Sequence, residues 1–249
     1  GANVSVSLTD EFLKPVERNG AYTPRWPEEN PKYTKRVSAR EVWDAIIKNA
    51  TDHAEPGLIF WDKMTEYLPA NAYPRFRSVS TNPCSEISLS PYDSCRLISI
   101  NVTGYVRHAF EKNSHFDWVL FKHDVSTAVQ MCDNLVDLEL ELIEKLKAVS
   151  SDKEERALWQ KLWNAGHEGR RTGLGLHGIG DMLAQLTIKY DSEDALNFIG
   201  KLEAVLRNVA YETSIELAKV RGKFPAFDWN IEKDNAFIKT LPDDILSGL

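Results

Sequence analysis

Hydrophobic and polar positions in the first hundred residues follow the patterns of short strands. Residues 3–8 (NVSVSL) alternate with period two, which is typical of a half-buried strand. Residues 57–61 (GLIFW) are wholly apolar, which favours a strand buried on both faces. Residues 96–103 (RLISINVT) resemble these runs in composition and predict a further strand.

Capping residues predict the helices between these strands. Thr9 is expected to cap a short helix that ends at Gly20. Ser38 and Glu41 form a capping box at the start of the next helix. Residues 21–37, rich in proline and charge, indicate a long connection between the two helices.

The second half of the chain is mostly helical. Ser151 and Glu154 form another capping box, and residues 192–221 predict a long helix. Cys132 belongs to an apolar stripe, where a cysteine is usually a small core residue, so a structural role is favoured over a functional one. The helix that contains it, over residues 124–150, shows these apolar residues at helical spacing: Val129, Leu135, Leu138, Leu142 and Leu146.

Strands separated by helices predict the α/β fold class, with buried and largely parallel strands. The chain has 249 residues, enough for one large domain or two small ones, and its hydrophobic content of 43% is ordinary for a globular protein. No internal repeat and no low-complexity linker divides it. By pattern alone, the chain is a candidate segment of a larger fold.

Charge and cysteine content exclude several classes of protein. The net charge of −7, with no block of lysine and arginine, argues against a nucleic-acid partner. No apolar run is long enough to predict a membrane span, and the first residues do not resemble a secretory signal. Three cysteines make a poor disulfide framework, so we expect a cytoplasmic protein.

Two sequence patterns suggest ligand sites only weakly. Residues 173–178 (GLGLHG) satisfy the G-x-G-x-x-G dinucleotide fingerprint, but that fingerprint needs an apolar strand before it, and HEGRRT precedes it here. Close packing of a turn is therefore favoured over cofactor binding. Arg170 and Arg171 beside it leave two alternatives open, a phosphate site or a salt bridge at a helix start. The six histidines show no zinc-ligand spacing, so we expect no metal.

Residues 81–95 (TNPCSEISLSPYDSC) contain two of the three cysteines, and they carry the strongest candidate site. Asn82, Cys84 and Glu86 alternate, so an extended segment would project all three side chains from one side. An amide, a thiol and a carboxylate on one face would combine a donor, a nucleophile or hydrogen-atom carrier, and a base. Pro83 stiffens the loop. The alternative is a polar loop with incidental cysteines, and chemistry alone leaves both open.

The segment TNPCSEISLSPYDSCRLISINV closely resembles the finger loop of ribonucleotide reductase catalytic subunits, and most of all the class II enzymes, which depend on adenosylcobalamin. Two more segments agree in order and spacing, GANVSVSLTDEF at the start and GRRTGLGLHGIGDML at residues 169–183. Class I loops more often have N-L-C and a longer gap to the second cysteine. The resemblance implies that residues 1–249 are the central segment of a ten-stranded α/β barrel, with Cys84 on a loop that enters its interior.

The resemblance also implies roles for four residues. Cys84 matches the cysteine that becomes a thiyl radical and takes the 3′-hydrogen of the ribose. Glu86 matches the base that removes the 3′-hydroxyl proton, and Asn82 matches the amide that positions the substrate hydroxyls. Cys95 matches one half of the dithiol that supplies two electrons. The implied cofactor is adenosylcobalamin, and the implied partners are a ribonucleoside di- or triphosphate substrate, a dithiol reductant such as thioredoxin, and a dNTP or ATP effector.

Some family features have no match in this chain. The second redox cysteine of the family lies upstream of anything that corresponds to Gly1, and Cys132 does not match it. The family's phosphate-binding loop would follow Leu249, and its C-terminal cysteine pair is absent. We therefore expect activity only when other segments complete the barrel.

Two alternatives to an enzyme segment of a reductase remain open. One is a non-catalytic scaffold that retains the loop by descent, and the joint presence of Asn82, Cys84, Glu86 and Cys95 weighs against it. The other is a thiol oxidoreductase, which predicts a C-x-x-C pair that the sequence lacks.

Overall fold

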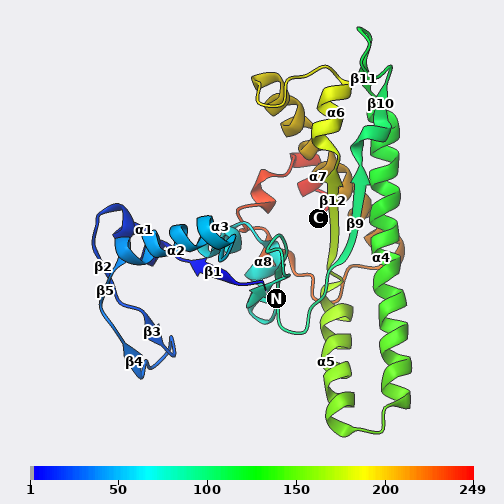
Figure 1. Cartoon of the computed structure of the whole chain (residues 1–249). Coiled ribbons are helices and arrows are strands. Elements are labelled where there is room, and N and C mark those ends of the chain that lie inside the picture. The colour runs from blue at the N-terminus through cyan, green and yellow to red at the C-terminus, as the bar shows by residue number, and fades with distance from the viewer. Residues whose placement is uncertain (1–2) are drawn as a thin grey trace. The chain divides into compact units, whose positions relative to one another are not determined.

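The computed structural model describes residues 3–249, which form two compact units. The first unit extends to Ser90 and also includes Asp234–Phe237, and the second comprises Pro91–Lys233 and Ile238–Leu249. The elements of both units are labelled in Figure 1. The expectation that residues 1–249 are one segment of a single barrel domain stays a prediction.

The first unit is built on a parallel pair of strands. Strand β1 (Ser5–Leu8) pairs with β6 (Gly57–Phe60), and helices α1 (Asp10–Glu17) and α2 (Ala39–His53) connect them. The two helices pack on the pair through a small core whose buried members are Leu8, Phe12, Val16 and Ala39. This arrangement confirms the predicted strands and helices. Phe60 is 49% exposed, however, so the expectation that both faces of β6 are buried is wrong.

The predicted long connection between α1 and α2 is a two-part β-ribbon (Figure 1). Strands β2 (Ala21–Tyr22) and β5 (Val37–Ser38) pair in antiparallel fashion, as do β3 (Arg25–Trp26) and β4 (Tyr33–Thr34). The Arg25 guanidinium donates to the Glu11 carboxylate at 2.7 Å, which ties the ribbon to α1. Short helical turns follow β6, namely α3 (Trp61–Glu66), η1 (Pro69–Ala72) and η2 (Pro74–Phe76).

The second unit is also built on a parallel pair. Strand β9 (Arg96–Asn101) pairs with β12 (Thr172–His177), and helices α4 (Trp118–Val149) and α5 (Lys153–Gly169) form the crossover between them. The long α4 lies beside the pair (Figure 1). The remaining elements are η3 (Val102–Tyr105), β10 (Val106–Arg107), β11 (His115–Phe116), α6 (Ile179–Gln185), α7 (Glu193–Arg221), α8 (Trp229–Glu232), η4 (Ile238–Thr240) and α9 (Asp243–Leu246).

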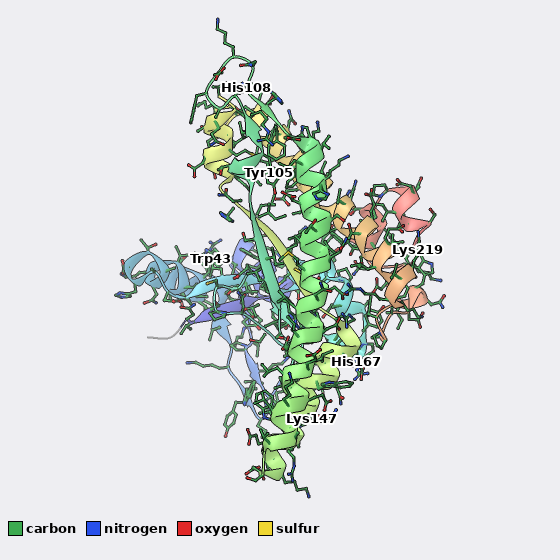
Figure 2. All side chains as sticks on the ribbon, turned by 90° about the vertical axis from the view of Figure 1, so that its right-hand side faces the viewer. Trp43, Tyr105, His108, Lys147, His167 and Lys219 are labelled. Atoms are coloured by element: carbon green, nitrogen blue, oxygen red, sulfur yellow. The ribbon has the colours of Figure 1, made fainter. Side chains whose placement is uncertain are left out.

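The buried face of α4 coincides only in part with the apolar stripe that the sequence predicted, of which Val129 and Leu146 are partly buried. Its buried residues are Phe121, Val125, Ala128, Cys132, Val136, Leu140 and Ile143. Leu138 and Leu142 of the predicted stripe are 60% and 55% exposed. Figure 2 shows α4 with its side chains along the whole helix. The helix was predicted because its periodicity is strong, but apolar residues on two faces left the buried face undecided.

Helix caps follow the sequence at α2 but not at α1 or α5. Thr9 precedes α1 without a capping hydrogen bond from its side chain, and the helix ends at Glu17 and not at Gly20. The Ser38 hydroxyl accepts a hydrogen bond from the Glu41 backbone N–H at 3.3 Å, which confirms the first capping box. At α5 the cap is Asp152, whose carboxylate accepts from the backbone N–H groups of Glu154 and Glu155. The prediction of Ser151 as the cap is therefore wrong by one residue.

Two parallel pairs with helical crossovers confirm the α/β class. The expectation of largely parallel strands holds only for these two pairs, because the other four pairs among the described residues, all of two-residue strands, are antiparallel. Residues 3–249 contain no closed barrel, because their strands form six separate two-stranded sheets. Within the same residues, no helix is long and apolar enough to cross a membrane.

Candidate functional site

The segment with the N-P-C-x-E sequence forms a hairpin in the first unit. Strands β7 (Ser80–Thr81) and β8 (Ser88–Leu89) pair in antiparallel fashion, and the residues between them form the turn. The Asn82 backbone N–H donates to the Ile87 carbonyl at 3.0 Å, and the Ile87 N–H donates back to the Asn82 side-chain Oδ1 at 2.9 Å. Ser85 takes a left-handed backbone conformation with φ of 69°.

The turn changes what the alternation of residues 82–86 implies. Because the segment reverses direction and is not extended, the argument that three side chains share one face does not hold. Asn82 is half-buried and its Oδ1 is used by the turn, whereas Cys84 and Glu86 are exposed near the tip. The hairpin still gathers an amide, a thiol and a carboxylate in one short loop.

A cavity of about 230 Å³ lies beside Cys84 within the first unit. Two side chains at the start of β1 hold the hairpin tip there: Asn3 Nδ2 donates to the Pro83 carbonyl at 3.0 Å, and the Ser5 and Ser85 hydroxyls are 3.2 Å apart. The lining residues are Asn3, Ser5, Ala54, Glu55, Gly57, Leu58, Pro83, Cys84 and Ser85. The cavity therefore lies at the amino ends of β1 and β6, whereas sites in α/β barrels usually gather at the carboxyl ends of the strands. Sequence reasoning missed Asn3, Ser5 and Glu55, because nothing local marks them.

Cys95 lies in the second unit, immediately before β9, and is half-buried. The residues on both sides of it are fixed to Glu139 of α4. The Ser94 hydroxyl donates to Glu139 at 2.9 Å, and the buried Arg96 guanidinium forms an ion pair with the same carboxylate. Arg96 also donates to the Arg171 carbonyl at 3.2 Å, so the start of β9 is held against β12 as well. Sequence patterns did not reveal Glu139, because its partners are distant in the chain.

Arg170 and Arg171 take part in ion pairs. Arg171 pairs with Asp93 at 2.5 Å, and both side chains are largely buried. Arg170, at the end of α5, donates to Asp133 at 2.7 Å and to Asp137 at 2.8 Å on α4. Of the two alternatives, the structure favours salt bridges over a phosphate site, but they lie at the end of α5 and not at a helix start.

The glycine fingerprint does not form a phosphate loop. Gly173 and Gly175 lie inside β12, so the residues of the fingerprint are a strand and not the turn after a strand. Gly178 alone has the left-handed conformation of a turn, with φ of 79°, before the seven-residue helix α6. Close packing is present at Gly173 and Gly178, but a Cβ on Gly175 would meet nothing within 4 Å, so the packing interpretation holds for two of the three glycines and the predicted turn for Gly178 alone.

Cys132 is a core residue, as its place on an apolar stripe predicted. Its side chain is 1% exposed, and its thiol donates to the Gly173 carbonyl at 3.7 Å. Burial raises the pKa of the Cys132 thiol, and the nearby Cys95 thiol adds to that increase. A buried thiol that is held neutral is a poor nucleophile.

None of the three cysteines forms a disulfide. Cys84 belongs to the first unit and Cys95 to the second. Residues 3–249 contain no group of three or more His, Cys, Asp or Glu residues placed to hold a metal ion. A larger hollow, of about 860 Å³, lies along α7 and includes none of the cysteines among its lining residues.

The comparisons with known proteins all match this chain to ribonucleotide reductases. The family model described as "Ribonucleotide reductase, barrel domain" matches residues 1–241. The chain is 35% identical over 225 residues to a protein of Mycobacterium tuberculosis named "Vitamin B12-dependent ribonucleoside-diphosphate reductase". This match covers 90% of this chain and 29% of that protein. The chain is 34% identical over 233 residues to a protein of the same name from Thermoplasma acidophilum, and this match covers 92% of this chain and 27% of that protein.

A solved structure shows the same fold. It is described as "Actinobacillus ureae class Id ribonucleotide reductase alpha subunit", and it superposes with a TM-score of 0.65 at 17% identity. The match covers 94% of this chain and 39% of that one. The chain thus spans less than a third of the two relatives and about two fifths of the solved structure.

Proposed function

Because the chain belongs to the ribonucleotide reductase barrel-domain family, we propose that it forms part of the catalytic barrel of a vitamin B12-dependent ribonucleotide reductase. The reaction converts a ribonucleoside di- or triphosphate to the 2′-deoxyribonucleotide. The observation that carries the proposal is the N-P-C-x-E hairpin, whose Cys84 thiol is exposed at the tip beside a cavity lined by polar groups. The names of the Mycobacterium and Thermoplasma relatives support the B12-dependent class.

Cys84 is the proposed radical carrier. As a thiyl radical it takes the hydrogen atom from C3′ of the ribose, and it returns a hydrogen atom to C3′ at the end of the cycle. A turn held by Asn82 and anchored through Asn3 and Ser85 is suited to this task, because it fixes the loop and leaves the sulfur exposed.

Glu86 and Asn82 are the proposed groups that handle the substrate hydroxyls. Glu86 is exposed on the same hairpin, and its carboxylate would accept the 3′-hydroxyl proton while the 2′-hydroxyl leaves as water. The Oδ1 atom of Asn82 already accepts a hydrogen bond within the turn, so its Nδ2 group is the part that would contact substrate. Asn82 would therefore both shape the loop and position the ribose.

Cys95 is the proposed half of the reducing dithiol. Together with a second thiol it would give up two electrons and two protons, so that one ribonucleotide and two thiols yield one deoxyribonucleotide, one disulfide and one water. Cys132 does not fit the role of second thiol, because it lies on the buried face of α4 and its thiol donates to the Gly173 carbonyl of β12. The second thiol would come from another segment of the complete protein, and a thioredoxin-type dithiol would restore both.

Adenosylcobalamin is the proposed source of the first radical, which it supplies by homolysis of its cobalt–carbon bond. Beside Cys84 the described residues do not form an enclosing site for it, because the cavity there, of about 230 Å³, is far smaller than a corrinoid ring. We therefore assign no residue to hold the cofactor. The remaining barrel, a nucleotide effector site and the reductant are likewise partners of the complete enzyme in this proposal.

Complementation tests the proposal. The chain is mixed with polypeptides that carry the remaining reductase regions, and adenosylcobalamin, a dithiol and ribonucleotide labelled with tritium at C3′ are supplied. Deoxyribonucleotide should form. With Cys95→Ser, tritium release should continue, because the radical thiol and the base are intact, but free base should replace the deoxyribonucleotide product.

The same assay can reject the proposal. If Cys95→Ser made deoxyribonucleotide at the normal rate over many turnovers, Cys95 would have no redox role. If the complemented wild-type chain released no tritium while the other regions folded and bound nucleotide, the scaffold alternative would replace the enzyme.

A further inference from the structure

The space around Gly173 contains a feature that the proposed roles do not explain. A Cβ atom built on Gly173 would lie 2.4 Å from the Cys95 sulfur, far inside the contact distance of the two atoms. The next atom it would meet is Cδ1 of Leu97 at 3.3 Å. The Cys95 thiol therefore occupies the space in which every other residue at position 173 would place its side chain.

The strand geometry shows on which face this contact lies. Gly173 is the register partner of Leu97, and paired residues in a parallel sheet point to the same face. Arg96 and Ile98 point to the opposite face, where Arg96 meets Glu139 of α4 and Ile98 joins the core. Leu97 is 55% exposed, so the Cys95 thiol lies on the open face of the β9–β12 pair.

The backbone beside Cys95 has little freedom to move away from Gly173. Ser94 and Arg96, its two neighbours, are both held by Glu139, and Asp93 is paired with Arg171, the residue just before the strand that contains Gly173. A side chain at position 173 would consequently displace the sulfur itself, and with it the direction in which the thiol points.

We infer that Gly173 is a positioning residue for the Cys95 thiol: its missing side chain forms the seat that fixes the sulfur on the open face of β9 and β12. The inference rests on the proposed function only in giving that fixed position a purpose, which is to present one half of the reducing dithiol to its oxidant. The geometric statement can be tested without turnover.

A double-mutant cycle in the full chain tests the seat, with a control on the same strand. Gly173→Ala should lower the melting temperature by about 5 °C, because overpacking costs stability. Cys95→Ala removes the sulfur, so in that background Gly173→Ala should have almost no effect, since the Leu97 side chain is exposed and can move. Gly175→Ala is the matched control, because a Cβ there meets nothing within 4 Å. It should show no coupling to Cys95→Ala.

The second readout is the reactivity of the thiol. In a Cys84→Ser background, the rate of Cys95 alkylation by iodoacetamide is followed by peptide mass spectrometry. Gly173→Ala should raise this rate by at least about five-fold, because the displaced sulfur becomes more accessible, and Gly175→Ala should leave it unchanged.

Each outcome of these two experiments either supports or contradicts the inference that Gly173 positions the Cys95 thiol. Additive effects of Gly173→Ala and Cys95→Ala, or an unchanged alkylation rate, would overturn it. If Gly173→Ala failed to fold, rescue by Cys95→Ala would support the seat and a second failure would overturn it. Failure of the redox role proposed for Cys95 can be distinguished from failure of this inference. In that case Cys95→Ser would leave turnover normal, while the coupling between positions 95 and 173 would persist.

Discussion

The hairpin of the first unit and the strand start of the second unit hold their cysteines in opposite ways. Cys84 is exposed at the tip of a short turn, which is fixed by hydrogen bonds to neutral groups such as Asn3 and Ser5. Cys95 is half-buried between Ser94 and Arg96, which are both anchored by Glu139, and the Asp93–Arg171 ion pair holds the preceding residues.

The difference matches the chemistry proposed for each thiol. A hydrogen-atom carrier has to reach both a radical source and the ribose, so an exposed tip with a defined turn is suitable. A reducing thiol has to meet a second thiol in a narrow range of geometry, because disulfides form only at specific distances and dihedral angles. A fixed, partly buried position between residues that are held by ion pairs provides that precision.

The largest expected effect is at the hairpin tip. Cys84→Ser should abolish deoxyribonucleotide formation in the complemented enzyme, because the O–H bond of an alcohol is too strong to relay the radical. Cys132→Ala, which changes the core cysteine, should retain turnover. Product formation and tritium release from C3′ measure both variants. Residual tritium release by Cys84→Ser at the wild-type rate would mean that Cys84 is not the radical carrier.

Glu86→Gln should reduce turnover by about 10²–10⁴-fold, the usual contribution of general base catalysis. The amide keeps the shape of the side chain and removes its basicity, so the hairpin should remain folded. Glu66→Gln is a suitable control, because Glu66 is an exposed carboxylate at the end of α3 in the same unit. Single-turnover rates compare the two, and equal rates would remove Glu86 from the chemistry.

Substitutions of Asn82 separate its two proposed roles. Asn82→Asp keeps the oxygen that accepts from the Ile87 N–H, so the turn should persist, but it loses the Nδ2 donor. Turnover should fall by about 10–100-fold through misplacement of the substrate. Asn82→Ala loses both groups, and amide hydrogen exchange at Ile87 should rise in this variant alone. Rapid exchange in both variants would show that Oδ1 does not hold the turn.

The ion pair that anchors the residues around Cys95 should contribute to the free energy of unfolding. Glu139→Gln weakens the ion pair with the buried Arg96, and we expect a loss of about 1–3 kcal/mol in the free energy of unfolding, reduced from the value for a fully buried pair because Glu139 is partly exposed. Glu141→Gln changes an exposed glutamate of the same helix and should have little effect. Denaturant unfolding measures the difference, and equal midpoints for both variants would contradict the anchoring role.

The smallest effect concerns the start of α5. The backbone N–H groups of Glu155 and Glu154 lower the pKa of the Asp152 carboxyl, so the ionised form stabilises the folded state. That stabilisation is present above the pKa of the unfolded chain and is lost as the pH falls through the lower folded pKa. Asp152→Ala should therefore lower the melting temperature near neutral pH and lose this effect in acid. Ser151→Ala should have none at either pH, and an equal effect would favour the sequence-predicted cap.

The sequence alone determined the features that depend on near neighbours. The strands at residues 3–8 and 96–103, the helix at 192–221 and the capping box of Ser38 are encoded by patterns within a few positions. Helical and strand periodicity and i to i+3 caps are local interactions, so they can be predicted without knowledge of the fold.

Only the tertiary structure decided which helix face is buried, which segment turns and which residues pack together, where the local sequence allowed more than one arrangement. Helix α4 has apolar residues on two faces, and packing in the second unit selected the face that contains Cys132 and not the one that contains Leu138. The alternation of residues 82–86 suggested an extended segment, but pairing of β7 with β8 made it a turn. The reason for a glycine at position 173 is a sulfur from a distant part of the chain. The buried face of α4 and the glycine at position 173 depend on contacts between residues far apart in sequence, and no local pattern records them. The turn forms between strands that are close in sequence, but the alternation of side chains did not reveal it.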